Sequence, residues 1–168
     1  MRFPVTAAAL LASLALSSTA YAQPAAPPAP SPPPVAPYGP TITAEQAQAA
    51  MTAAEAHARQ NGWVVAITIV ENSGDLVMFK KATGTQYGST QVAMNKARSA
   101  AMFRRPSKAF ADQAASGSIV PLAVPGAMPI EGGVPIIVGG RQIGAIGVSG
   151  VQAQQDGQIA AAGAAAVR

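Results

Sequence analysis

The stretch PIEGGVPIIVGGRQIGAIGVSG, residues 129–150, constrains the fold more than any other part of the chain. Two apolar runs flank Gly139 and Gly140, and adjacent glycines favour a tight hairpin turn because both tolerate positive φ. Both faces of such a hairpin are largely apolar, so the sheet needs cover on both sides. The register predicted across the turn is Val138 opposite Arg141, Ile136 opposite Ile143, and Val134 opposite Ala145.

The ends of this hairpin are rich in glycine. Glu131, Gly132 and Gly133 precede the first strand, and a further Ser-Gly pair at 149–150 follows the second. Glycine at a strand end permits close approach of another backbone or of a ligand. The alternative interpretation is that these glycines only form turns and bulges.

Residues 1–22 have the pattern of a secretory signal peptide. Arg2 supplies the positive start, residues 7–16 are apolar, and Ala20-Tyr21-Ala22 forms a cleavage site before Gln23. The apolar run is too short to span a bilayer, and no later stretch is long enough to do so. We therefore expect an exported protein, periplasmic or secreted, without a membrane span.

Residues 23–40 contain nine prolines among eighteen positions, which favours an extended, disordered spacer. The remaining residues, 41–168, are enough for a single domain with one sizeable core. The chain has no cysteine, so its fold does not depend on disulfides and it cannot form a thiolate metal site.

The pattern along residues 41–168 alternates helices with hairpins. Thr43 and Gln46 form a capping box at the start of a helix over 43–61. Strands are predicted at 63–70 and 75–81, helices at 89–103 and 108–115, a short strand at 119–120, and a last helix at 152–167. This order predicts an α+β fold (an α/β sandwich) in which about five largely antiparallel strands carry helices on their faces.

Between Asp75 and Asp112 the chain has no acidic residue. The basic residues of this interval are Lys80, Lys81, Lys96, Arg98, Arg104, Arg105 and Lys108. Such a block favours an anionic partner, although a solvated basic face is the alternative. Nucleic acid fits poorly with export and with 5% aromatic residues, so a small carboxylate-bearing ligand is the better prediction.

Three features of this block and its surroundings indicate a binding site. Lys96 lies on the buried stripe of the helix at 89–103, so its stem can pack while its ammonium reaches a cleft. Arg104 and Arg105 precede a helix that Ser107 could cap, an arrangement that suits an anion. His57 is the only histidine, and sequence alone leaves it as either a ligand or a surface residue.

Three segments, NKARSAAMFRRPSKAF at 95–110, the stretch at 125–150, and QQDGQIAAAG at 154–163, resemble the GlcG/HbpS family of haem-binding proteins. The same domain forms the C-terminal part of PduO-type cobalamin adenosyltransferases. The resemblance covers the chain from Thr43 onward and implies homo-oligomers that bind haem or a related tetrapyrrole. It also implies a hydroxyl near the haem iron at Ser107, where haem-binding members carry threonine. The chain departs from the family pattern at Glu71 and at Gly157.

The resulting main hypothesis is an exported, homo-oligomeric haem-binding protein in haem handling or redox sensing, not an enzyme. Lys96, Arg104 and Arg105 would pair with the propionates, and Ser107 or His57 would approach the iron, beside the loop of Glu131, Gly132 and Gly133. The alternative is an enzyme or sensor of the glycolate-utilisation type, acting on a small carboxylate with Glu131 as base and a basic anion clamp. A third hypothesis is an oligomeric scaffold without a ligand.

Overall fold

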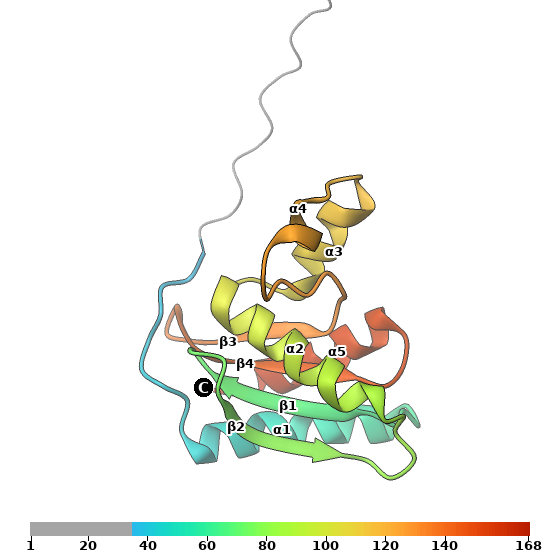
Figure 1. The fold of residues 1–168 in the computed structure, drawn as a ribbon. Helices are drawn as coiled ribbons and strands as arrows, with labels where there is room; N and C mark the ends of the chain where they lie inside the picture. Colours follow the sequence, from blue (N-terminus) through green and yellow to red (C-terminus); the bar gives the residue numbers. More distant parts are fainter. Residues whose placement is uncertain (1–34) are drawn as a thin grey trace, which may run out of the picture. The chain divides into compact units, whose positions relative to one another are not determined.

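The computed structural model describes residues 35–168, and Figure 1 shows their fold. The predicted signal peptide, and the predicted spacer up to residue 34, lie outside the described residues. In chain order the elements are α1 (Ala44–Gln60), β1 (Ala66–Glu71), β2 (Leu76–Lys81), α2 (Gly88–Phe103), α3 (Ser107–Ala115), α4 (Val120–Ala123), β3 (Gly133–Val138), β4 (Arg141–Ser149) and α5 (Ala153–Ala165). The predicted α+β class is confirmed.

Within residues 35–168 the sheet has four strands in the order β2-β1-β4-β3, and every pair is antiparallel. This is one strand fewer than the sequence pattern predicted. The prediction of a short strand at 119–120 is wrong, because Val120 begins the helix α4 and Pro121 occupies the first turn of that helix. Proline fits that position since its missing N–H would have no partner there, whereas a strand would need it.

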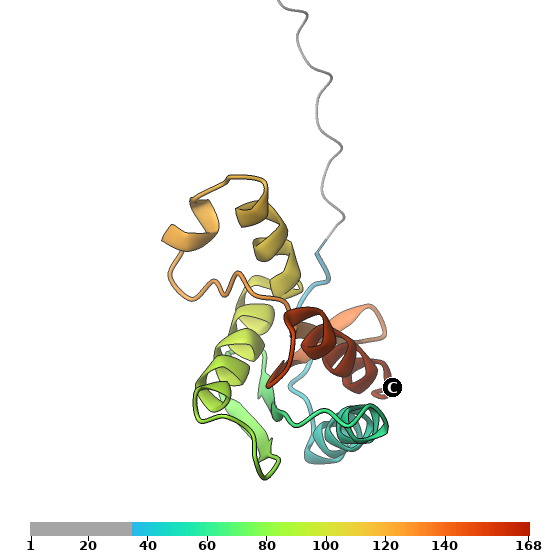
Figure 2. The same cartoon turned by 90° about the vertical axis from the view of Figure 1, so that its right-hand side faces the viewer.

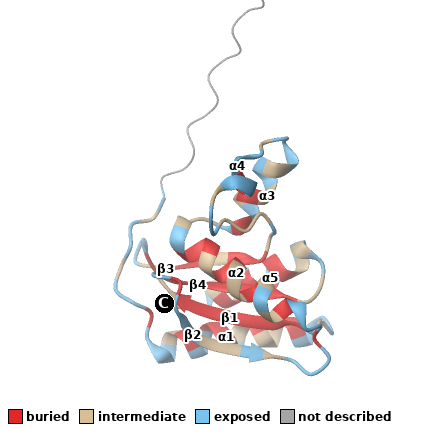
Figure 3. Cartoon of the chain, viewed as in Figure 1, coloured by how far each residue is buried: buried red, intermediate tan, exposed pale blue. Residues whose placement is uncertain are grey.

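The sheet lies between two helical layers (Figure 2). Helix α2 covers one face, and α1 and α5 pack together on the other. The core divides accordingly: Val70 and Ala145 pack with alanines of α2, whereas Ile69 and Ile146 pack with α1 and α5. β1 and β4 are therefore buried on both faces, as Figure 3 shows.

Helix α1 begins and ends as its sequence predicted. The Thr43 hydroxyl accepts the N–H of Gln46 at 3.2 Å, and the Gln46 side chain accepts the N–H of Thr43 at 3.1 Å, which completes the capping box. Asn61 caps the C-terminus, and Gly62 follows with a φ of 68°. Both signals act locally, so no tertiary contact was needed to recognise them.

The hairpin of β3 and β4 turns at Gly139 and Gly140, both at positive φ, and pairs Val138 with Arg141 as predicted. Further from the turn the predicted register is wrong. The register shifts between Ile136 and Ile137, so that Ile136 faces Gly144 and Val134 faces Ile146.

The physical reason for the shift lies in the core. Ile143 and Ile146 both pack on the side of α1 and α5, although residues three apart in a regular strand point to opposite faces. A β-bulge at Ile143 resolves the conflict because it adds one residue to β4. The bulge also leaves Gln142 on the other face, where its Nε2 donates to the Ala101 carbonyl of α2 at 2.8 Å.

Candidate functional site

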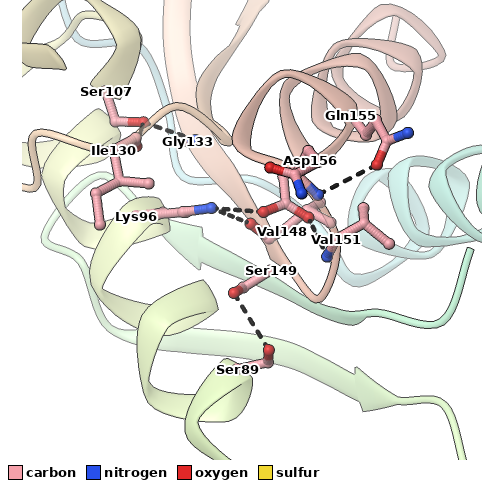
Figure 4. Close-up of polar contacts among 11 residues, drawn as sticks. Ser89, Lys96, Ser107, Ile130, Gly133, Val148, Ser149, Val151, Gln155 and Asp156 are labelled. Atoms are coloured by element: carbon pink, nitrogen blue, oxygen red, sulfur yellow. Dashed lines mark hydrogen bonds and ion pairs between the residues drawn. The ribbon is translucent and has the colours of Figure 1, made fainter. Parts of the chain in front are cut away.

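A set of polar residues and glycines gathers where α2, the entry to β3, the end of β4 and the start of α5 meet (Figure 4). We call this set the polar junction. It comprises Lys96, Ser107, Glu131, Gly132, Gly133 and Asp156. Five of these six, all except Asp156, were predicted site residues. The fold thus brings together predicted positions from Lys96 to Gly133, which lie 37 residues apart in the sequence.

Lys96 and Asp156 form a buried ion pair at the centre of the polar junction. The Lys96 Nζ donates to Asp156 Oδ2 at 2.8 Å and to the Val148 carbonyl at 3.0 Å. The two side chains are 1% and 3% exposed, so the prediction that this ammonium reaches an open cleft is wrong. Asp156 was given no role from sequence, although it lies in the Gln-Asp pair of the third family-like segment.

Asp156 is held from two sides. Its second oxygen, Oδ1, accepts the N–H of Val151 at 3.3 Å. Burial raises the pKa of Asp156 above its ordinary value, while the hydrogen bond and the charge of Lys96 oppose that rise. The Lys96 ammonium therefore stabilises the ionised form of Asp156, which burial alone disfavours.

The glycines of the polar junction allow the backbones to approach closely, as one of the two sequence interpretations predicted. A Cβ on Gly132, which has a φ of 128°, would lie 2.8 Å from Lys96 Nζ. A Cβ on Gly133 would lie 2.2 Å from the Lys96 carbonyl oxygen. Any side chain at these positions would displace Lys96, so the glycine pair and the buried ion pair depend on each other.

Ser107 joins the start of α3 to the entry of β3. Its hydroxyl donates to the Ile130 carbonyl at 2.7 Å and accepts the N–H of Gly133 at 2.9 Å. The residue is completely buried. The prediction that Ser107 caps α3 is wrong, because Pro106 holds the N-cap position and the serine hydroxyl is committed to the neighbouring loop.

Arg104 and Arg105 lie at the junction of α2 and α3, and both are half-buried. Arg104 ends α2 in the left-handed conformation, with a φ of 53°, and its guanidinium lies 5.0 Å from the centre of the Tyr38 ring. Arg105 donates from Nε to the Phe103 carbonyl at 3.3 Å and lies over the Phe110 ring. Both guanidinium groups are thus oriented by aromatic faces.

Glu131 lies against the first turns of α5. Its Oε1 would be 2.5 Å from a Cβ placed on Gly157, so the glycine at this position makes room for the carboxylate. Among residues 35–168, the ion pairs join Lys80 to Glu55, Lys96 to Asp156 and Lys108 to Asp112, and none involves Glu131. Two cavities of about 370 and 290 Å³ are lined by other residues.

His57 lies on α1, away from the polar junction. Its Nε2 is buried and has no hydrogen-bond partner among the described residues, and its ring centre is 6.0 Å from that of Trp63. Because α1 and α2 cover opposite faces of the sheet (Figure 2), His57 and the pair Arg104 and Arg105 do not line one site within a chain.

The basic residues between Asp75 and Asp112 are distributed over several elements. Their side chains lie on β2, on α2, at the junction of α2 and α3, and on α3, and each has its own partner within the described residues. These partners are Glu55 for Lys80, the Tyr87 ring for Lys81, Asp156 for Lys96, the Gly74 carbonyl for Arg98, the Tyr38 ring for Arg104, the Phe103 carbonyl for Arg105, and Asp112 for Lys108.

Over residues 35–168, no helix combines the length and the apolar character needed to cross a membrane. In the same range, His, Asp and Glu side chains do not gather in groups of three that could hold a metal ion.

Comparison with known proteins extends over nearly all of the described domain. Residues 42–165 match the family described as "Haem degrading protein HbpS-like". Protein GlcG of Escherichia coli K12 is 32% identical over 108 residues, which cover 64% of this chain and 81% of GlcG. An uncharacterized 15.0 kDa protein of Citrobacter freundii, from the dhaT-dhaS intergenic region, is 30% identical over 124 residues, covering 71% and 87% of the two chains.

Solved structures agree with this result. The Klebsiella pneumoniae protein ORFY superposes with a TM-score of 0.71 at 26% identity, over 76% of this chain and 91% of ORFY. A double mutant of HbpS from Streptomyces reticuli gives 0.69 at 29% identity, over 84% and 97%. A haem complex of PduOC gives 0.69 at 22% identity, over 76% and 96%, and at that identity it supports the fold alone. The match covers all four strands and all five helices in full, so the chain belongs to the HbpS-like family.

Proposed function

We propose that this chain is an exported protein that binds haem, or a closely related tetrapyrrole, and acts in haem handling or redox sensing. Membership of the HbpS-like family supports this function, since the description of that family names a haem-degrading protein. The PduOC structure adds that the same fold accommodates haem in another protein. Bound haem would supply a redox-active iron.

The observation that carries the proposal is the unpartnered Nε2 of His57. A buried ring nitrogen without a hydrogen bond is unusual, and a neutral imidazole nitrogen is a common axial ligand of haem iron. Ser107 is the weaker candidate for this role because its hydroxyl already donates one hydrogen bond and accepts another. We therefore assign the axial ligand to His57, whose ring has to turn outward to present the buried Nε2 to the iron.

Arg104 and Arg105 are the candidates for binding the propionates. Lys96 is less suited because its ammonium is buried against Asp156. Helices α1 and α2 cover opposite faces of the sheet, so one haem can contact both His57 and these arginines only across an interface between copies of the chain. That arrangement agrees with the homo-oligomer predicted from sequence.

The test is a titration of the purified protein with hemin, followed at the Soret band. We expect a saturable red shift that is lost in His57→Ala and kept in Gln60→Ala, an exposed residue of the same helix. Replacing both Arg104 and Arg105 by Ala should weaken binding on the order of 100-fold, since two charge-assisted hydrogen bonds are removed. The proposal fails if the wild-type protein gives no saturable shift, and the ligand assignment fails if His57→Ala binds like wild type.

Export has a separate test. Cleavage after Ala22 should leave a mature protein that begins at Gln23. N-terminal sequencing and intact mass of protein recovered from the periplasm or medium measure this directly. Recovery there of a chain that still carries residues 1–22 would contradict the assignment.

A further inference from the structure

A cavity of about 370 Å³ lies between α1 and the hairpin of β1 and β2. Its apolar walls come from Ala58 of α1, Trp63 and Val65 of the following segment, and Ile67 of β1, with Ala82 at the end of β2. β2 is an edge strand, so the cavity lies at the side of the sheet. Nothing in the polar junction contributes to it.

The charged residues at this cavity have an excess of one positive charge. The Lys80 Nζ lies 2.6 Å from Glu55 Oε1 and so links β2 to α1. Arg59 is exposed on α1 one turn after Glu55 and also lines the cavity. With Lys80 neutralised by Glu55, the guanidinium of Arg59 is the group of this set that is left to attract an anion.

We propose that this cavity binds a small apolar molecule that carries one carboxylate, with a planar ring as the best fit. A volume of about 370 Å³ is near the lower end of small-molecule pockets, which begin at roughly 300 Å³. The Trp63 ring offers an aromatic surface on which a flat ligand can pack. Arg59 binds the carboxylate at the cavity mouth, where it keeps contact with water.

This site has lining residues of its own, although it adjoins the His57 side of the proposed haem site, since the His57 and Trp63 ring centres lie 6.0 Å apart. Arg104, Arg105 and Ser107 belong to the layer on the opposite face of the sheet, and His57 does not line the cavity although it neighbours Ala58 in α1. The two proposals also have different optical signals. Because the phenylacetate titration uses haem-free protein, its failure and a failure of haem binding are distinguished by separate measurements.

Trp63 makes the test direct, because it is the only tryptophan in the protein and it lines the cavity. Haem-free protein is titrated with phenylacetate while tryptophan fluorescence is recorded, and phenylacetamide serves as the uncharged analogue of the same shape. We expect a saturable change with phenylacetate and about tenfold weaker binding of the amide, since it lacks the charge that Arg59 attracts.

Two variants locate the site. Ala82 is exposed and its N–H donates to the Val65 carbonyl, a bond that any side chain at 82 can keep, so Ala82→Phe fills the cavity mouth without burying new polar groups. It should abolish the fluorescence response to phenylacetate. Arg59→Gln should weaken phenylacetate binding about fivefold, as expected for loss of one exposed charge pair, and should leave phenylacetamide unchanged.

Lys81→Gln is the matched control for the loss of a positive charge. Lys81 follows Lys80 in β2, but its ammonium lies over the Tyr87 ring and it does not line the cavity. Its phenylacetate affinity should equal that of wild type. Circular dichroism checks the fold of each variant, and if Ala82→Phe is unfolded the Arg59→Gln result decides.

Three results would each overturn the proposal. The first is a wild-type fluorescence signal that does not saturate at millimolar phenylacetate. The second is equal affinity for phenylacetate and phenylacetamide. The third is wild-type affinity in both a folded Ala82→Phe variant and Arg59→Gln.

Discussion

At the scale of single residues, the Lys96 and Asp156 pair is the most demanding feature of this protein. Two buried charges lose their hydration, and only close pairing with further hydrogen bonds compensates for that loss. Here the Val148 carbonyl accepts a second hydrogen bond from Lys96, and the Val151 N–H donates to Asp156. Because Lys96 belongs to α2 and Asp156 to α5, the pair ties together the two helical layers beyond the end of β4.

Replacing Lys96 by Met should lower the free energy of unfolding by about 3–5 kcal/mol, because it leaves a buried carboxylate without its counter-charge. Adding Asp156→Val in the same chain should restore more than half of that loss, since both charges are then gone and the groups that lose partners are backbone groups of Val148, Gly150 and Val151. Urea unfolding of the two single variants and the double variant measures both effects. A Lys96→Met loss below about 1 kcal/mol would show that the pair is not buried in solution.

The pH dependence of stability tests the state of Asp156. Its pKa in the folded protein lies above the ordinary value of 3.8 that applies in the unfolded chain, so the folded protein takes up this proton first on acidification. Relative to Asp156→Asn, the free energy of unfolding of wild type should therefore rise as pH falls from about 7 to about 4. Urea unfolding at several pH values measures the difference between the two proteins. A difference that shrinks towards acid would mean that Lys96 lowers the pKa of this carboxyl instead.

At the scale of elements, the sequence predicted those features that depend on neighbouring residues. The capping box of Thr43 and Gln46 and the turn at Gly139 and Gly140 are local signals, and both are confirmed. The bulge at Ile143 was not predictable, because it follows from which face of the sheet meets α1 and α5. The missing fifth strand has a similar cause, since residues 119–120 lie in the α3–α4 segment and not beside the sheet.

The polar junction shows the same limit. The sequence identified Lys96, Gly132 and Gly133 as unusual, but the motifs and periodicity did not pair Lys96 with Asp156, which lies 60 residues further along the chain. A buried lysine on a helix stripe requires a buried carboxylate nearby. By that argument Asp156 is the carboxylate to choose, because the family-like segment around it opens a helix directly after the last strand.

The close approach of α2 to β4 provides a prediction at this scale. A Cβ on Gly147 would lie 2.2 Å from the Ala93 carbonyl oxygen and 2.9 Å from the Ala97 Cβ, so Gly147→Ala must push α2 away from the sheet. We expect a loss of about 2–3 kcal/mol in the free energy of unfolding, or failure to fold. Thermal and urea unfolding measure this loss.

Gly88→Ala is the matched control, because a Cβ on Gly88 meets no atom within 4 Å and the residue opens the same helix. It should be neutral or slightly stabilising, as expected for alanine in place of glycine in a helix. Equal effects of the two substitutions would show that α2 does not approach β4 as closely as described.

At the scale of the whole described domain, the apolar strands receive the cover that the sequence predicted. The helices α1, α2 and α5 cover β4 on both sides, so β4 leaves little apolar surface for a partner chain. One group of exposed apolar residues, Ile119, Val120 and Leu122, lies on the α3–α4 segment, which projects from the two helical layers (Figures 1 and 2). Ile119 is 76% exposed there and Leu122 is 70% exposed.

This surface is the most direct test of the predicted homo-oligomer. Neighbouring apolar side chains that remain exposed on a projecting helix are costly in water, and association with a second copy would bury them. We therefore expect the wild-type protein to have the mass of an oligomer in light scattering at micromolar concentration, and Leu122→Glu to shift it towards the monomer mass. Gln113→Glu, which adds the same charge at an exposed position of α3, should keep the wild-type mass. If wild type is itself monomeric, the prediction of a homo-oligomer is wrong; if Leu122→Glu keeps the oligomer, the contact lies on another surface, and the exposed Leu76 and Val77 of β2 become the next positions to substitute.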